Sequence, residues 1–378
     1  MLRRIGNTCI CIIFICAAIY AFLYCIGGRE KITLYFANNE IDEVELQEIY
    51  RGIDKEKYYF KNISPEEQKA YTEIYYILTK FDSEKEVSVG SKEQFNKVLT
   101  CVLNDYPEIF YINGYAYNLS SRDKIVVSPE YTCTKEEADQ KMQLIENYSQ
   151  LCLANCPDTD DQYYILKYLY EYIIQHTNYN AISSDNQSMC SVMINGVSVC
   201  QGYAKALQYL LKKEGIESIF VVGKTSKGIN HAWLEVNING EWYCCDPTWG
   251  DTKFNSGCIE ENSVNYDYLC TSTDEFTTTH LVDNVIDVPM CYSMKDNYYV
   301  REGYYIDNYD RQKAIDLYDK ALEKGKNNFY FKCKDKDVYE SAGQDLINNE
   351  GIFEIITDES IQVSYGEYSK QREYIFWF

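Results

Sequence analysis

The chain has 378 residues, of which 46% are hydrophobic and 15% aromatic, and its 36 basic and 58 acidic residues give a net charge of −22. This composition is typical of folded protein, and the length suffices for two or three domains. Phosphate contacts need clustered lysine and arginine, so the charge argues against nucleic acid as a partner. We interpret the acidic excess as a solvated surface.

The amino terminus carries a long uncharged stretch. Arg3 and Arg4 precede residues 5–28, which contain no charged side chain. As a helix this stretch would span a hydrocarbon core of ~30 Å, and the basic residues before it would stay in the cytoplasm. A cleaved signal peptide is the alternative, but Ile19 stands where a small residue favours cleavage. We therefore expect a transmembrane signal-anchor over residues 1–28, a single-pass location in the cell membrane, and an extracytoplasmic main body.

Of the sixteen cysteines, four lie within the expected anchor. An extracytoplasmic location permits disulfides, but the spacing of the other twelve is not that of a disulfide-stapled small domain. Cys152 and Cys156 lie close in sequence, yet no second pair completes a zinc-binding set. We predict that most of the twelve are core residues, and that the protein uses no metal and no cofactor.

An α+β unit is predicted over residues 29–157. Residues 29–63 are weakly patterned and suggest one or two strands. Ser64, Pro65 and Glu67 have the pattern of a capping box with proline in the first turn, which predicts a helix that continues through Leu78. The remaining elements expected here are a helix ending before Pro107, strands at Tyr111–Leu119 and 124–127, and a helix from Thr134 to about Leu153.

Two further units are predicted, at residues 158–300 and 301–378. The first begins with a helix over 162–179, continues with a helix over 201–213, and is then dominated by short strands. The second is a small α+β unit. Its expected elements are helices at 311–324 and 338–348, and strands at 329–333, 352–357 ("IFEIIT") and 372–378 ("REYIFWF").

Cys200 stands where a strand-like run meets an amphipathic helix, in "VCQGYAKAL". The unpaired N–H groups and the dipole of a helix start favour an anion, and therefore a reactive thiolate. Gly202 is expected to leave room for a substrate backbone. A cysteine at a helix start is, however, more often simply buried, so a nearby general base is needed to support a nucleophile.

A hairpin supplies that base. Asn239-Gly240 is a strong two-residue turn signal, and the resulting register places Trp233 opposite Asp246. His231 and Asp246 then become diagonal neighbours on one face of the hairpin, within reach of each other. The opposite face is predicted to pack against the core through Ala232, Leu234, Val236, Ile238, Tyr243 and Cys245.

Other histidines and cysteines receive structural interpretations. His176 is expected to pack or cap late in its helix. His280, in a loop after the core, could line the cleft, but a structural role is favoured. Cys244 shares the face of His231, where it is expected to line a wall or to pair in a disulfide.

These residues suggest a reaction. His231 would take the proton of Cys200, Asp246 would hold the imidazole, and the N–H of Cys200 would form one arm of an oxyanion hole. This predicts acyl transfer through a thioester, with water as acceptor in a protease or amidase and a lysine amine in a cross-linking enzyme. The sequence does not choose between them. The alternative is a catalytically silent module that binds peptide or cell wall.

The blocks "VCQGYAKAL", "NHAWLEV" and "YCCDPTWGD" resemble those of the transglutaminase-like (transglutaminase/protease-like) superfamily, in its bacterial membrane-anchored or extracytoplasmic type. The resemblance covers about 162–283. It implies an α+β fold with a papain-like core, in which the cysteine helix packs on an antiparallel sheet. It also implies the catalytic set Cys200, His231 and Asp246, and a protein or peptide substrate, for which the cell surface is one source. The implied near-site residues are Gln201, Gly202, Tyr203, Asn230, Trp233 and Trp249.

Overall fold

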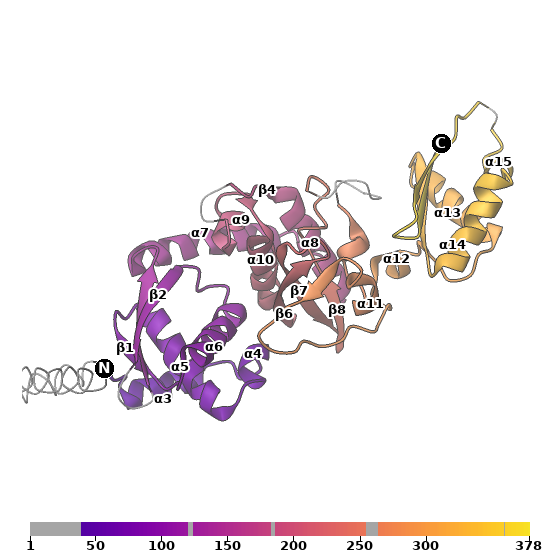
Figure 1. Ribbon diagram of the computed structural model, residues 1–378. Coiled ribbons are helices and arrows are strands. Elements are labelled where there is room, and N and C mark those ends of the chain that lie inside the picture. The colour runs from indigo at the N-terminus through magenta and orange to yellow at the C-terminus, as the bar shows by residue number, and fades with distance from the viewer. Residues whose placement is uncertain (1–38, 120–123, 183–185, 255–263, 359) are drawn as a thin grey trace, which may run out of the picture. The chain divides into compact units, whose positions relative to one another are not determined.

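The computed structural model describes residues 39–119, 124–182, 186–254, 264–358 and 360–378 (Figure 1). No helix within these ranges is long and apolar enough to cross a membrane, and the predicted anchor at residues 1–28 lies outside them. The chain divides between Glu136 and Glu137 into two compact units. The described cysteines are all free, and eight of the eleven are buried, as predicted for core residues.

The first unit combines helices with a three-stranded antiparallel sheet of order β1-β3-β2. Its longest helix begins as predicted, because the Ser64 hydroxyl accepts from Glu67 N–H while the Glu67 carboxylate accepts from Ser64 N–H. The elements are α3 (Glu43–Gly52), α4 (Tyr58–Lys61), α5 (Pro65–Lys80), β1 (Lys85–Val87), α6 (Lys92–Asp105), β2 (Ile112–Leu119) and β3 (Ile125–Tyr131).

The strands expected over residues 29–63 are absent from residues 39–63, which contain the helices α3 and α4, and residues 29–38 lie outside the described ranges. Asp42 caps α3 by accepting hydrogen bonds from the N–H groups of Val44 and Glu45. Only Leu46 of this helix is buried, so the apolar stripe is too thin to be recognised from the periodicity.

The second unit contains a helix packed on an antiparallel sheet. Helix α10 (Cys200–Lys213) contacts strands β6 and β7 as well as helices α8 and α9 (Figure 1). This mixed α+β arrangement is the one predicted for this region. The sheet has the order β8-β7-β6-β9. The elements are α7 (Lys135–Leu153), α8 (Gln162–His176), β4 (Asn178–Tyr179), α9 (Met189–Met193), β5 (Val197–Ser198), β6 (Ser218–Thr225), β7 (Asn230–Ile238), β8 (Glu241–Cys245), η1 (Tyr266–Tyr268), α11 (Thr273–Phe276) and β9 (His280–Val282).

The β7–β8 hairpin has the predicted register, with Ile238 opposite Glu241 and Leu234 opposite Cys245. It differs from the prediction in two ways. Strand β8 ends at Cys245, so Asp246 is not paired with Trp233 but donates its N–H to the carbonyl of Tyr268. Both faces of β7 are also buried rather than one, because Phe276 of α11 and Trp249 pack against Trp233 and His231 on the second face.

The carboxy-terminal part of this unit is a four-stranded sheet of order β10-β11-β13-β12, with helices on one face (Figure 1). "IFEIIT" forms a short helix instead of the predicted strand. Ile352 and Ile355 are buried and Phe353 is exposed, which is the spacing of a helix. The elements are α12 (Tyr298–Arg301), β10 (Tyr305–Ile306), α13 (Arg311–Glu323), β11 (Asn328–Cys333), α14 (Lys336–Gly343), η2 (Gln344–Asn348), α15 (Ile352–Ile355), β12 (Ser364–Tyr368) and β13 (Glu373–Trp377).

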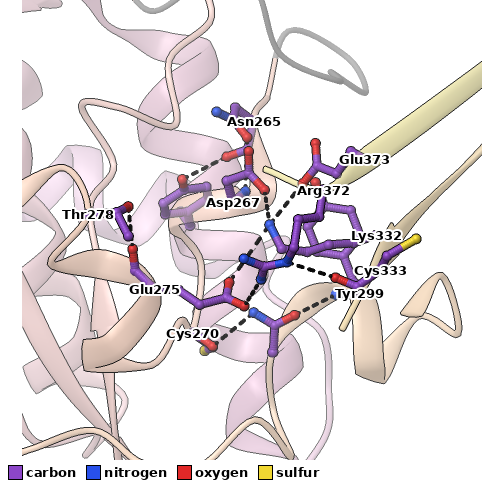
Figure 2. A network of polar contacts seen from close by, with 12 residues as sticks. Asn265, Asp267, Cys270, Glu275, Thr278, Tyr299, Lys332, Cys333, Arg372 and Glu373 are labelled. Atoms are coloured by element: carbon purple, nitrogen blue, oxygen red, sulfur yellow. Dashed lines mark hydrogen bonds and ion pairs between the residues drawn. The ribbon is translucent and has the colours of Figure 1, made fainter. Parts of the chain in front are cut away.

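A buried ionic network connects this sheet to the elements around the β7–β8 hairpin (Figure 2). The Lys332 ammonium lies 2.8 Å from Asp267 Oδ1 and 2.9 Å from Glu373 Oε1. Beside it, Arg372 donates to Glu275 Oε1 of α11 at 2.6 Å. Because Lys332 is only 4% exposed, it depends on these carboxylates for the solvation that it loses on folding.

Candidate active site

Cys200 is the first residue of α10 and is half-buried. The short strand β5 leads into the helix, and Val199 occupies the cap position with extended backbone angles. An apolar valine cannot cap, so its side chain does not satisfy the N–H groups of the first turn. The helix start therefore presents donors and a positive dipole end beside the thiol, as predicted.

Gly202 is required for a different reason than expected. A Cβ built at this position would lie 2.0 Å from Ser198 Oγ, 2.7 Å from Ser191 Oγ and 2.8 Å from the carbonyl of Ser188. The space beside Gly202 is thus filled by the protein itself. The two serine hydroxyls lie 2.6 Å apart and fix the approach of β5 and α9 to the first turn of α10. The glycine thereby positions Cys200 and does not make room for a substrate.

His231 lies in β7 and connects the thiol to the carboxylate. Its Nε2 donates to Asp246 Oδ2 at 2.7 Å. The hydrogen bond of His231 with Cys200 therefore involves the other ring nitrogen, Nδ1. Burial opposes a charge on His231, but Asp246 and Cys200 outweigh it and raise its pKa to about 10. The arrangement therefore favours an imidazolium beside the Asp246 carboxylate.

Asp246 is fully buried, and four hydrogen bonds compensate for its desolvation. Oδ1 accepts from the backbone N–H groups of Thr248 at 2.8 Å and Trp249 at 3.3 Å. Oδ2 accepts from His231 and from His280. Burial alone would raise the pKa of Asp246, but the two histidines hold it well below its usual range. The group is an ionised carboxylate in a fixed orientation.

His280 is the residue that the sequence interpretation missed. It begins strand β9, and its Nε2 lies 3.1 Å from the Asp246 oxygen that also accepts from His231. The Thr279 hydroxyl donates to its Nδ1 at 2.8 Å, and its ring stacks on Phe276 at 3.9 Å. The expectation of a structural loop residue is thus corrected. The one sequence signal that could have found it was scarcity, since the chain has three histidines.

The two imidazoles differ in charge. Burial lowers the pKa of His280 and the positive charge on His231 lowers it further, against the opposing effect of Asp246. His280 is therefore a neutral donor to Asp246, whereas His231 carries the proton. Two cations facing one carboxylate would repel each other, which explains why only one of the pair is charged.

The other predicted site residues lie at varying distances from the two histidines and Asp246. Trp233 is fully buried, with its ring 6.1 Å from that of His231 and 5.2 Å from that of His280. The Trp249 ring lies 4.8 Å from His280. Tyr203 is buried and donates to Asp251 Oδ2 at 2.9 Å, which ties α10 to the loop after Asp246.

Two predicted near-site residues are not buried. Gln201 is partly exposed in the first turn of α10, and Asn230 is exposed at the start of β7. Both therefore flank their neighbours Cys200 and His231 on the side that faces solvent, where a substrate would arrive.

A metal does not suit this group, although donor atoms of His231, Asp246 and His280 lie within 4.8 Å of one another. Both Nε2 atoms are hydrogen-bonded to Asp246 Oδ2, so each already has a partner. A metal ion would need both imidazole nitrogens free of protons, and the same contacts favour a protonated His231.

Residues 154–247 match the family model of the transglutaminase-like superfamily. This confirms the predicted resemblance over a stretch that includes Cys200, His231 and Asp246. No curated protein matches the chain.

Solved structures show partial similarity. A TGase has 16% identity and a TM-score of 0.28, covering 41% of this chain and 48% of its own. A provisionally assigned cysteine protease from Cytophaga hutchinsonii has 13% identity and a TM-score of 0.26, covering 42% of this chain and 65% of its own. A provisionally assigned protease from Parabacteroides distasonis has 10% identity and a TM-score of 0.22, covering 38% of each chain. The chain thus spans less than two thirds of the length of each of these proteins.

Proposed function

We propose that this protein is a cysteine-dependent acyl-transfer enzyme that acts on peptide or side-chain amides through a thioester on Cys200. The observation that carries the proposal is the bonding of His231, which contacts Cys200 with one ring nitrogen and Asp246 with the other. A module that only binds peptide or cell wall has no need of this buried, charged arrangement.

The reaction begins with the thiolate–imidazolium pair. The Cys200 sulfur attacks the amide carbonyl carbon, and a C–S bond forms as the carbonyl electron pair moves to oxygen. The backbone N–H groups at the start of α10 stabilise that oxyanion. His231 then gives its Nδ1 proton to the amide nitrogen, the C–N bond breaks, and the amine leaves. The acyl group remains on Cys200 as a thioester.

The second half regenerates the enzyme. His231, now neutral, takes a proton from the acceptor as the acceptor attacks the thioester carbonyl. The C–S bond breaks, and the thiolate and imidazolium are restored. Water as acceptor yields a carboxylic acid, and a lysine amine yields a new amide. Asp246 keeps its negative charge throughout and orients the ring, because its four donors leave little affinity for a further proton.

A thiol-directed activity probe tests the proposal. We expect the reduced wild-type protein to be labelled and Cys200→Ala to be unlabelled. Cys333→Ala is a matched control, since Cys333 is buried and far along the chain from this site. Turnover of a peptide-library substrate with and without an added amine then identifies the acceptor. Labelling equal in wild type and Cys200→Ala, or no labelling of the reduced wild type, would favour the silent binding module.

We further propose that the enzyme is held by its amino terminus at the membrane, with the main body extracytoplasmic. The support is the uncharged stretch 5–28 that follows Arg3 and Arg4. Membrane fractionation and amino-terminal sequencing test this, because an intact terminus in the membrane fraction is expected. A soluble product that starts near residue 22 would contradict it.

A further inference from the structure

A second cluster of metal-ligating side chains lies on the same hairpin as His231 and outside the proposed catalytic set. It consists of Glu235 in β7, Cys244 in β8, and Cys291, which follows β9. One ligand atom from each lies within 4.8 Å of the others. The three residues are 2%, 3% and 1% exposed. Two thiols and a carboxyl group therefore converge in the interior.

The backbone holds each of the three in place. Glu235 and Cys244 are directly opposite each other in the β7–β8 register, so their side chains share a face. Cys244 is bridged on its other side to Thr271, with N–H to carbonyl distances of 2.9 and 3.0 Å. Cys291 exchanges two hydrogen bonds of 2.8 Å with Thr273. The cluster is thus a built site.

Two polar atoms beside these thiols have no partner within the described part of the chain. Glu235 Oε2 and Thr271 Oγ1 are both buried and make no hydrogen bond there. Thr271 is paired with Cys244 on one side, and Glu235 is paired with Cys244 on the other. Thr271 and Glu235 therefore flank the same thiol. A buried carboxyl oxygen without a hydrogen-bond partner is costly. An orphaned acid aimed at two thiols indicates that a ligand belongs there.

We infer that Glu235, Cys244 and Cys291 form a buried binding site for a thiophilic divalent cation, with Zn²⁺ as the expected ion. Zinc binds thiolate sulfur at ~2.3 Å and carboxylate oxygen at ~2.0–2.2 Å, so two ligands of one ion lie at most ~4.6 Å apart. In a tetrahedral zinc site such ligand atoms lie ~3.6–3.8 Å apart, and the three ligand atoms of the cluster all lie within 4.8 Å of one another. We assign the fourth position to a water held by the Thr271 hydroxyl, which has no partner in the described part of the chain and whose residue is bridged to Cys244.

A disulfide between Cys244 and Cys291 would explain fewer of these observations than a bound cation does. The proposed extracytoplasmic location would permit it, but it would leave the Glu235 carboxyl group as unpartnered as before. A cation satisfies the carboxylate and both sulfurs together, with the protons of the two thiols and of Glu235 released on binding.

The position of the site suggests what it does. Cys244 precedes Asp246 by two residues, and Cys291 lies in the chain that leaves β9. A bound cation would cross-link β7, β8 and that segment, and would fix the end of β8 where Asp246 begins. The site is therefore structural, since its three protein ligands are fully enclosed and a substrate has no access.

The test uses the reduced full-length protein, purified in mild detergent without chelators. We expect about one equivalent of zinc per chain by elemental analysis. Cobalt substitution should give the intense near-ultraviolet absorption of sulfur-to-cobalt charge transfer. Cys291→Ser should abolish that band, and Glu235→Gln should keep it while weakening metal affinity by ~100-fold or more, because even outer-sphere partners contribute ~10–100-fold. Cys333→Ser, at a buried cysteine outside the cluster, should behave like wild type.

Three results would overturn the inference. The first is that wild-type protein with free thiols binds neither zinc nor cobalt. The second is that Cys291→Ser and Glu235→Gln bind cobalt as the wild type does. Peptide mapping without reduction could instead identify a Cys244–Cys291 disulfide. Glu235→Gln keeps the shape of the side chain, so it tests the site even if a cysteine variant fails to fold. None of these readouts depends on turnover, so they are independent of the proposed catalytic function.

Discussion

His280 Nε2 donates a hydrogen bond to Asp246 Oδ2 at 3.1 Å, and the same oxygen accepts a hydrogen bond from His231 Nε2. The carboxylate therefore serves two imidazoles, one charged and one neutral. Because the neutral ring stacks on Phe276 and packs against two tryptophans, it cannot swing away. His280 is thus a positioning residue that holds Asp246 for His231.

The proposed triad should respond unequally to substitution. We expect His231→Ala to be about as inactive as Cys200→Ala, because it removes the proton donor and the partner of the thiolate. Asp246→Asn should be impaired but measurable. The corresponding change in a serine triad costs up to ~10⁴ in turnover, and a preformed thiolate depends less on proton removal. Steady-state turnover of one peptide substrate checks the order, and near-wild-type activity of His231→Ala would exclude the triad.

His280→Phe should lower kcat without changing KM substantially. Phenylalanine keeps the stacking on Phe276 but removes one of the four donors that hold the Asp246 carboxylate in its orientation. A hydrogen bond to a charged group contributes ~1.5–3 kcal/mol, so we expect a ~10–100-fold loss of kcat. The pH profile of kcat should shift as well, because the donor acts on His231 through Asp246. His176→Phe, at an exposed histidine late in α8, is the control and should leave the profile unchanged.

Both the activity and the stability of the fold should fall at alkaline pH as His231 loses its proton, and the stability can be measured directly. Its pKa is raised from 6.5 to about 10 in the folded protein. A raised pKa stabilises the fold fully below the unfolded value, and this contribution disappears between about pH 6.5 and 10. The free energy of unfolding of wild type should therefore decline over this range more steeply than that of His231→Ala. Parallel curves for the two proteins would contradict the assignment.

Gly202→Ala should destabilise the protein and reduce its activity. The new Cβ would meet Ser198 Oγ at 2.0 Å, and relief requires α10 and β5 to separate beside Cys200. Overpacking of this kind costs ~1–3 kcal/mol, which exceeds the ~1 kcal/mol that alanine gains in a helix. Gly52→Ala in α3 is the matched control, since nothing lies within 4 Å of its Cβ, and it should be neutral or stabilising in thermal unfolding.

Lys332→Met should be strongly destabilising. The change leaves Asp267 and Glu373 buried without their shared cation, and breaking a buried pair in this way costs ~3–5 kcal/mol. Lys336→Met breaks only the exposed pair with Glu340, so it should cost at most ~0.5 kcal/mol. Denaturant unfolding compares the two. Equal midpoints would show that the network in Figure 2 contributes nothing.

The sequence by itself determined the features that depend on short-range chemistry. Ser64 and Glu67 were sufficient to place the start of α5, because capping involves neighbours three residues apart. Asn239-Gly240 was sufficient for the hairpin register, since the turn sets every later pair. The placement of Cys200 at the start of α10 followed from helical periodicity. These interactions close within a few residues and need no knowledge of the fold.

Tertiary structure decided what covers those elements. Periodicity predicted one buried face for the hairpin, but Phe276 and Trp249 bury the other face too, and the chain that leads into β9 brings His280 to Asp246. Cys291 reaches Cys244 and Glu235 by the same route. In both cases the partners are separated by tens of residues, so their approach depends on the path of the whole chain rather than on local pattern. Gly202 was singled out by its motif, but only packing against Ser198 and Ser191 revealed its role.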